Sequence, residues 1–334
     1  MKRVTIKDVA ERAGVSFGTV SRALADHPEI SQATKERIRR ISEEMGYVSN
    51  NAARGLVKKN TQTIGLIVSD ISNPYFSEIA LSVEMAAREQ GYRVILCNTL
   101  RSPERDLDAL EQMLRQQVDG IIVALSAAEG IETFQRTLGS TPAVFLGNNH
   151  SGACSYVSVD NYKIGYIGGR YLAQLGHREI AFLGPRGDSA TSHIRIKGFL
   201  DAVGEIGAHG YTYMCPPELA DRGRYYELAV RFFEEGHRPS AIFAYSDRFA
   251  LGVLQAAPEF RIAVPEDISL IGADNISYCG LPRINLTTLS PHKRTIGRIA
   301  TDRLIQKIKG DAREYHDVLE PELIIRGSCR NVSR

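Results

Sequence analysis

Ser16, Phe17, Gly18, Ser21 and Arg22 have the residue types and spacing of a surface that reads DNA bases. They would lie on one short helix, and the N-terminal part of the second helix of a helix-turn-helix protein enters the major groove. The Arg22 fork can donate two hydrogen bonds to guanine O6 and N7, which discriminates between bases by about 1–3 kcal/mol. Phe17 offers only apolar contact, for instance to a thymine methyl, and Gly18 has no side chain. We therefore predict that base preference rests mainly on Arg22 and Ser21.

Two helices joined by a short turn must position that surface. Thr5 can cap the first helix, with Asp8 at the capping-box spacing, and Gly14 should end it. Ser16 can cap the second helix, FGTVSRAL, after a turn of about three to four residues. The hydroxyls of Thr5, Ser16 and Thr19 are suited to positioning phosphates. A third helix is predicted in QATKERIRRISEEMG.

Basic charge is concentrated in the same region. Residues 1–60 contain 12 Lys and Arg against 7 Asp and Glu, a net charge of +5, which leaves −3 for the rest of the chain. A basic segment on a mildly acidic body is expected when only that segment meets a polyanion. The alternative is a generic three-helix bundle whose arginine is solvated, and charge alone does not decide between the two.

From residue 61 the sequence changes to short apolar runs that alternate with amphipathic helices. TIGLIVSD precedes PYFSEIALSVEMAAREQG, and EIAFLG later precedes IRIKGFLDAVGEIG. Such alternation predicts right-handed crossovers and parallel sheets. Roughly 270 residues of it exceed one ordinary core, so we expect two similar α/β lobes. Ligands bind beyond the C-terminal ends of such strands, which here read SD, NT and ADN.

The composition is that of a globular protein of two or three domains, with 334 residues and 43% apolar side chains. No run approaches the roughly 18 apolar residues of a membrane span, and MKRVTIKDVAERAG lacks the apolar core of a signal peptide. We therefore expect a cytoplasmic protein without membrane contact. The five cysteines never show CxxC spacing, which favours reduced thiols over disulfides or a zinc site.

Signatures of enzymes are weak. The sequence has neither GxGxxG nor GxxxxGK[ST], so the phosphate cradles of dinucleotide and P-loop enzymes are missing, and it has no HExxH. The aspartates of SVDN and GADN could form a carboxylate pair for sugar hydrolysis. Strand-end aspartates that bind a ligand or cap a helix explain them more simply. We predict no enzymatic activity and no cofactor.

Several stretches carry a family resemblance that covers nearly the whole chain, namely TIKDVAERAGVSFGTVSRAL, IGLIVSDISNPYFSEI, LGHREIAFLGP and VPEDISLIGADN. They resemble the LacI/GalR family of bacterial transcription regulators. The resemblance implies a repressor that binds a palindromic operator in double-stranded DNA as a homodimer or tetramer, under allosteric control by a small-molecule effector. It implies a helix-turn-helix domain at 1–48, a hinge at 49–60, and a two-lobed α/β core of parallel sheets flanked by helices, similar to periplasmic binding proteins. The implied lobes are 61–161 with 289–319, and 162–288 with 320–334.

The stretch SNNAARGLVKKN, residues 49–60, has the composition of a passive tether. The resemblance implies instead a hinge helix that orders on specific DNA, with Asn51 and Arg54 contacting DNA and Leu56 in the minor groove. A wedge that partly unstacks a base step explains such a leucine. Family members usually have proline at the place of Ser49, and Gly55 weakens a helix by about 0.5–1 kcal/mol relative to Ala. We expect the segment to be unfolded without DNA and a dimer partner.

The resemblance also implies an effector site between the lobes. Aromatic side chains would form a stacking wall, and an Arg and an Asp would bind hydroxyls or mixed polar groups. The implied contacts are Asn73, Tyr75, Phe76, Ser126, Asn148, Ser189, Thr191, Arg195, Ser246, Asp247 and Asp274. Structural alternatives exist, because the aromatic pair could be core residues at a helix start, the arginine an ion-pair member and Asp274 a loop cap.

The effector class is the least determined feature. Gly147 and Asn148 stand where the family commonly has Asp, and Ser246 stands where sugar-responsive members often have Asn. We expect a sugar or sugar derivative, and Arg186 with Arg195 keeps a sugar acid or sugar phosphate open. The sequence leaves open whether the effector strengthens or weakens DNA binding. The rival classes are a solute-binding protein, which would need a signal peptide and no DNA-binding helices, and a sugar-modifying enzyme fused to such helices. We expect a nucleoid-associated protein.

Overall fold

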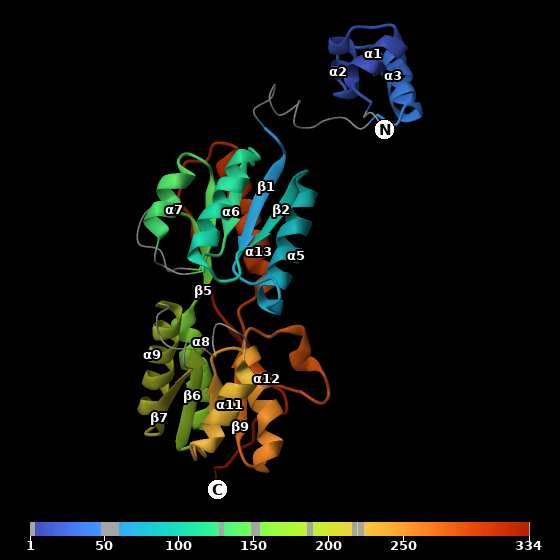
Figure 1. The fold of residues 1–334 in the computed structure, drawn as a ribbon. Coiled ribbons are helices and arrows are strands. Elements are labelled where there is room, and N and C mark those ends of the chain that lie inside the picture. Colours follow the sequence, from blue (N-terminus) through green and yellow to red (C-terminus); the bar gives the residue numbers. More distant parts are fainter. Residues whose placement is uncertain are drawn as a thin grey trace. The chain divides into compact units, whose positions relative to one another are not determined.

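The computed structural model describes residues 4–47, 60–126, 130–147, 154–185, 190–215, 219 and 224–333. It divides into two compact units, Met1–Thr61 and Gln62–Arg334, which we call the head and the core (Figure 1). Some predicted contacts lie outside the described residues, namely Asn51, Arg54, Leu56, Asn148 and Ser189.

The head contains α1 (Ile6–Ala13), α2 (Phe17–Leu24) and α3 (Gln32–Glu44). The predicted capping box begins α1, because the Asp8 carboxylate accepts a hydrogen bond from Thr5 N at 2.7 Å and Asp8 N donates to Thr5 Oγ1 at 3.4 Å. α1 ends at Gly14, whose φ of 63° lies in the left-handed region that favours glycine. Local signals thus place both ends of α1 as predicted.

A small core of short side chains holds the three helices together. The buried apolar residues come from all three helices and are Val9, Ala10, Ala13, Val20, Ala23 and Ile38. This packing fixes α2 across α1 and α3, so the helix-turn-helix arrangement is confirmed.

The first lobe of the core is built on a parallel sheet with strand order β11-β5-β4-β3-β1-β2. Its strands are β1 (Thr63–Val68), β2 (Arg93–Asn98), β3 (Gly120–Val123), β4 (Ala143–Leu146), β5 (Tyr156–Val159) and β11 (His316–Leu319). One face of the sheet packs against α5 (Pro74–Glu89) and α13 (Lys293–Ile308), and the other against α6 (Pro103–Arg115) and α7 (Ile131–Leu138) (Figure 1). Because helices cover both faces, β1 is an almost continuous buried run.

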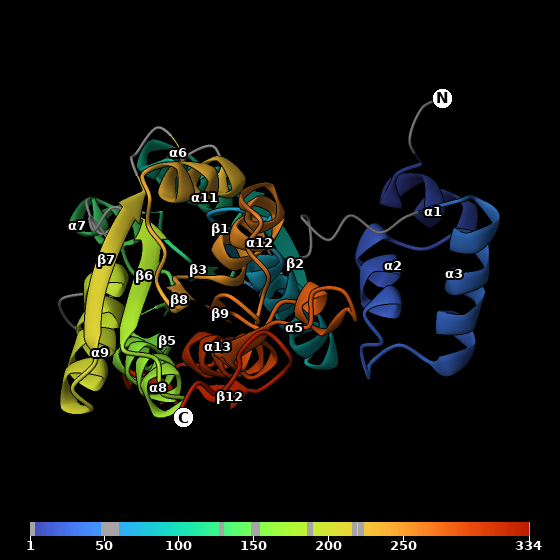
Figure 2. The same ribbon diagram turned by 90° about the horizontal axis from the view of Figure 1, so that it is seen from below.

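The second lobe repeats this plan with strand order β12-β10-β9-β8-β6-β7 (Figure 2). Its strands are β6 (Glu179–Pro185), β7 (His209–Cys215), β8 (Ala241–Ala244), β9 (Ser269–Ala273), β10 (Thr287–Ser290) and β12 (Glu322–Ile324). The flanking helices are α8 (Asn161–Gln174), α9 (Ala190–Glu205), α11 (Tyr225–Glu234) and α12 (Asp247–Ala256), with short 3-10 turns at Ala257–Phe260 and Ser277–Gly280. The predicted two-lobed α/β fold is confirmed, although β12 pairs antiparallel with β10.

The chain passes between the lobes at residues 160, 291–292 and 320–321, which connect β5 to α8, β10 to α13, and β11 to β12. The expected boundary between residues 288 and 289 falls inside β10. That strand pairs with β9 from Thr287 to Leu289 and so lies wholly in the second sheet. The sheet pairing therefore places this crossing a few residues later in the chain.

Helices α8 and α9 approach each other at backbone contact distance. A Cβ on Gly165 would lie 1.9 Å from the carbonyl oxygen of Arg195, and a Cβ on Gly198 would lie 2.1 Å from the carbonyl oxygen of Tyr162. Only glycine, which has no Cβ, permits this approach. The backbone that carries Arg195 is therefore held against α8, the helix that follows the first crossing.

Candidate functional site

Two of the three hydroxyls predicted to position phosphates, those of Thr5 and Ser16, act as helix caps in the head. Ser16 Oγ accepts a hydrogen bond from Thr19 N at 3.1 Å and lies 2.9 Å from Thr19 Oγ1. The Thr5 hydroxyl donates to Asp8 Oδ2 at 2.8 Å. The Thr5 and Ser16 hydroxyls are therefore engaged in capping, and the contact of Thr5, Ser16 and Thr19 with phosphates stays a prediction.

The predicted base-reading residues lie on one helix and face outward. Phe17 is 64% exposed, Arg22 is exposed, and Gly18 and Ser21 are half-buried on α2. Arg22 Nη1 donates to Glu29 Oε2 at 3.3 Å, a contact that the sequence analysis did not foresee. The head therefore offers one guanidinium, one hydroxyl and one ring on a continuous surface.

In the core, four side chains from both lobes form what we call the interlobe cluster: Tyr75 of the first lobe and Arg195, Tyr245 and Asp274 of the second. Burial raises the pKa of the Tyr75 phenol, and the Asp274 carboxylate raises it further while Arg195 opposes it. The charges of the second lobe thus act directly on a side chain of the first. Tyr75, Arg195 and Asp274 belong to the predicted effector site, whereas Tyr245 was not predicted.

The start of α5 positions the aromatic wall. Asn73 caps this helix through its Oδ1, which accepts from Tyr75 N at 3.2 Å. The rings of Tyr75 and Phe76 meet edge to face with centroids 5.0 Å apart, and both pack partly against the core of the first lobe. The interpretation of this pair as core residues at a helix start is therefore confirmed, and their contact with an effector stays a prediction.

Arg195 is 5% exposed and held on two sides. Its Nη2 donates to Asn161 Oδ1 at 2.6 Å, its Nη1 donates to the Tyr245 carbonyl at 2.5 Å, and its guanidinium lies 4.5 Å from the centroid of the Tyr245 ring. Its Nε is buried without a hydrogen-bond partner among the described residues. An unpaired buried donor costs free energy that a ligand oxygen would recover.

Asp274 directly follows β9 and has a φ of 118°, which is unusual for a non-glycine residue. Burial raises its pKa to about 7, with a further contribution from the neighbouring Asp247 carboxylate, while Arg195 and Lys293 oppose the rise. Lys293 Nζ donates to the carbonyl oxygens of Asp274 and Asn275, the latter at 2.6 Å, and lies 3.4 Å from Glu78 of the first lobe. Lys293 therefore ties the Asp274 loop to α5.

Asp247 lies in the interior of the second lobe. Its carboxylate accepts from Thr288 Oγ1 at 2.5 Å, from Ile276 N at 2.9 Å and from Cys279 Sγ at 3.1 Å, and its side chain is fully buried. Burial raises its pKa. The structure thus places Asp247 as a support of the loop that follows Asp274.

The structure describes three further residues of the predicted effector site, namely Ser126, Ser246 and Thr191. Ser126 donates to Asp106 Oδ1 at 3.0 Å and lies 3.2 Å from Thr99 Oγ1. Ser246 is buried at the start of α12, and Thr191 lies on α9 one turn before Arg195. Ser126 is therefore engaged by side chains of the first lobe.

A second polar group, which we call the latch, joins the lobes through Asp70 and Arg101 of the first and Tyr225 and Arg248 of the second. Asp70 Oδ2 accepts from Arg248 Nη1 at 2.9 Å and from Arg101 Nη2 at 3.1 Å, and that same Nη2 lies 3.4 Å from the Tyr225 hydroxyl. Burial opposes ionisation, but hydrogen bonds from Ser72 and Arg248 hold the pKa of Asp70 below its ordinary value. The latch is therefore ionic near neutral pH.

Asn161, Tyr245, Lys293 and the latch were not predicted from the sequence. Asn161 follows Asp160 in VSVDN, and Tyr245 and Arg248 flank the SD of AYSD, so the strand-end rule already pointed to their neighbours. Nothing in the sequence marks Lys293 as a link between lobes.

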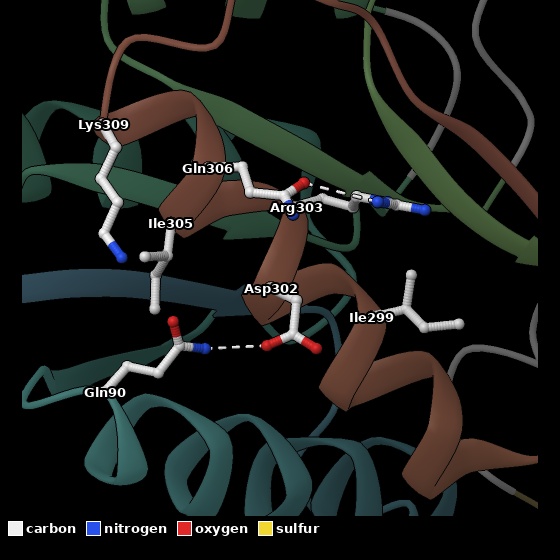
Figure 3. A pocket seen from close by; sticks show the side chains of 7 residues that line it. All are labelled: Gln90, Ile299, Asp302, Arg303, Ile305, Gln306 and Lys309. Carbon is white, nitrogen blue, oxygen red and sulfur yellow. Dashed lines mark hydrogen bonds between the residues drawn. The ribbon is translucent and has the colours of Figure 1, made fainter.

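A hollow of about 360 Å³ lies elsewhere, along α13 and the end of α5 (Figure 3). Its polar side chains bind one another or neighbouring groups, because Gln90 Nε2 donates to Asp302 Oδ1 at 2.8 Å and Arg303 pairs with Asp317 at 2.8 Å. No helix in the described part of the chain has the length and apolarity to cross a membrane.

Comparison with known proteins decides the family. Residues 5–50 match the profile of bacterial regulatory proteins of the lacI family, and residues 170–329 match that of the periplasmic binding protein-like domain. The HTH-type transcriptional repressor PurR of Vibrio atlanticus is 32% identical over 332 residues, 98% of this chain and 99% of that protein. The chain belongs to the LacI family. It is accordingly a DNA-binding transcriptional repressor, not an enzyme.

Solved structures of the family share its fold. The Lac repressor dimer bound to operator and the anti-inducer ONPF has a TM-score of 0.88 and 27% identity, covering 98% of this chain and 100% of that one. A LacI family regulator from Enterococcus faecium with bound ribose has a TM-score of 0.70 and 25% identity, covering 81% of this chain and 100% of that one.

Proposed function

We propose that this LacI-family repressor binds a palindromic operator as a homodimer and changes its operator affinity when a sugar or sugar derivative binds at the interlobe cluster. The observation that carries the proposal is the convergence of Tyr75 from one lobe with Arg195 and Asp274 from the other. A ligand that contacts both lobes favours one lobe arrangement over another, which is the requirement for allosteric control. The protein would act in the cytoplasm, at its operator.

Two segments of the head would contact DNA in different ways. Residues 1–48 would read the operator through Arg22 and Ser21, with Phe17 on a thymine methyl and Thr5, Ser16 and Thr19 on phosphates. Residues 49–60 would form the hinge, with Asn51, Arg54 and Leu56 at the minor groove. The two lobes, between which the chain crosses at residues 160, 291–292 and 320–321, would enclose the effector.

The chemistry of the interlobe cluster suits hydroxyl groups. Arg195 Nε is a buried donor, the Asp274 carboxyl accepts or donates depending on its protonation, and the Tyr75 and Phe76 rings offer an apolar face. A sugar presents donors and acceptors around its rim and C–H groups on its face. The ribose bound to the Enterococcus faecium regulator is a ligand of this class.

A homodimer is supported by apolar surface on the first lobe. Leu81 and Met85 of α5, Leu96 of β2 and the following Leu100 are 41–58% exposed. α5 and β2 are neighbouring elements, and large exposed apolar patches mark interaction surfaces. The Lac repressor structure to which this chain is similar is a dimer on operator.

The test combines a ligand screen with operator binding. Thermal shift of the full chain against ribose, other sugars, sugar acids and sugar phosphates should find a ligand, since one present at 100 times its Kd stabilises by about 2.7 kcal/mol. Fluorescence anisotropy on a duplex selected from a randomised library then shows whether that ligand raises or lowers operator affinity. Asp274→Asn should abolish the shift, whereas Asp267→Asn in the same lobe should not. A sugar response that survives Asp274→Asn would place the effector elsewhere.

A further inference from the structure

The side chain of Arg22 runs back along α2 over a position that has no side chain. Its Nη2 would lie 3.9 Å from a Cβ at Gly18, one turn earlier in the helix. Helical side chains point toward the N-terminus of their helix, and in this motif that end meets the bases. Gly18 therefore leaves space in which a base edge can approach the guanidinium.

Glu29 holds the guanidinium from the connection between α2 and α3. Glu29 Oε2 accepts from Arg22 Nη1 at 3.3 Å. The Glu29 segment is itself tied to α2, because Glu29 N donates to His27 Nδ1 at 3.4 Å and His27 N donates to the Arg22 carbonyl at 3.0 Å. Residues 27–29 are therefore bonded to the backbone of Arg22, and they also carry the acidic partner of its side chain.

This ion pair contributes little to folding, because the two side chains are 54% and 67% exposed. Its expected effect on DNA recognition is larger than its effect on folding. A guanidinium has five N–H donors, and Glu29 engages one nitrogen, so Nε and Nη2 remain for the two acceptors of guanine. A carboxylate at this place also cancels the charge that would attract Arg22 to any phosphate.

We propose that Glu29 is a specificity-determining residue of the head, which orients Arg22 for guanine and suppresses its sequence-independent attraction to phosphates. The inference rests on the proposed base contact of Arg22. In this arrangement Gly18 leaves space for a base, and Arg22 contacts that base. Glu29 holds the Arg22 side chain in place, and we call this contact the brace. Removing the brace should therefore strengthen binding to arbitrary DNA while weakening the preference for guanine.

The experiment uses the full chain and two DNA probes. The first is a random-sequence duplex, titrated from low to moderate salt. Glu29→Gln should bind it more tightly at low salt, with the slope of log K against log salt steeper by about 0.9. The second is a duplex library with a randomised core. The guanine preference at the Arg22-dependent position should fall about threefold to tenfold, part of the discrimination of a bidentate contact.

Glu43→Gln is the matched control, because it removes the same charge from an exposed site on α3. The proposal predicts that Glu43→Gln leaves the guanine preference unchanged, and that Glu29→Gln has no effect on base preference in an Arg22→Ala background. If Glu29→Gln and Glu43→Gln behaved equally in both assays, the proposed role of Glu29 would be wrong, whereas the base contact of Arg22 could still hold. A wild-type motif without an Arg22-dependent guanine would overturn the base contact and the brace together.

Discussion

The two arginines assigned to recognition have opposite surroundings. The Arg22 side chain in the head is 54% exposed and has one exposed acidic partner, whereas Arg195 in the core is 5% exposed and is held by Asn161 and Tyr245. A base reader must enter a hydrated groove, so it stays at the surface and contributes little to folding. A small-ligand site is built before its ligand arrives, so its residues are also part of the packed core. Substitution of the exposed Arg22 should therefore change binding alone, and substitution of a buried residue of the ligand site in the core should change stability as well.

The largest effect is expected from Gly198→Ala in α9. The new methyl would lie 2.1 Å from the Tyr162 carbonyl oxygen, so α8 and α9 must separate, at a cost of about 3 kcal/mol or more in the free energy of unfolding. Gly204→Ala, in the same helix with no atom within 4 Å of the new methyl, should be neutral or stabilising by about 0.5–1 kcal/mol. Urea unfolding measures both. Equal stability of the two variants would contradict the close helix contact that holds Arg195.

Asp247→Ala should lower the free energy of unfolding by about 2–3 kcal/mol, because Ile276 N and Thr288 Oγ1 lose their buried acceptor. Asp247→Asn keeps an acceptor oxygen and should be less damaging. Circular dichroism in urea, with ligand-induced thermal shift on the same samples, separates folding from binding. An Asp247→Ala protein of wild-type stability that has lost only its ligand response would make Asp247 a contact residue, as the family resemblance implied.

The latch should have a smaller effect that depends on salt. Arg248→Ala removes the 2.9 Å pair with Asp70. The Arg248 side chain is 22% exposed and that of Asp70 is 14% exposed, so the loss should lower the free energy of unfolding by about 1 kcal/mol at low salt. Arg298→Ala, which breaks a pair with Glu89 inside the first lobe, is the control for a lost surface arginine. Ligand affinity should change only in Arg248→Ala, because only that pair spans the lobes. If Arg248→Ala and Arg298→Ala changed ligand affinity equally, the latch would have no role in the lobe arrangement.

The smallest change in stability is expected from Arg22→Ala, which should alter the free energy of unfolding by less than about 0.5 kcal/mol, as exposed substitutions usually do. Selection from a randomised duplex library should nevertheless lose one guanine from each half-site. Should Arg22→Ala destabilise the head by several kcal/mol, the contrast between an exposed reader and a buried ligand site would not hold.

Local features could be predicted from the sequence because their partners lie within about one helical turn. The capping box of Thr5 with Asp8, the end of α1 at Gly14 and the Ser16 cap all depend on contacts between near neighbours. The alternation of buried strands with amphipathic helices likewise indicated two parallel-sheet lobes. The latch, in contrast, joins Asp70 to a residue 178 positions away, which no local pattern marks.

The sequence by itself therefore determined the helix-turn-helix head, the α/β lobes and the family, because caps, periodicity and motifs are properties of neighbouring residues. Only the tertiary structure decided how the recognition groups are held. It paired Arg22 with Glu29, enclosed Arg195 between Asn161 and Tyr245, and turned Asp247 inward. The physical reason is that the surroundings of a polar side chain depend on which distant segments pack around it, and those surroundings set its exposure, partners and charge.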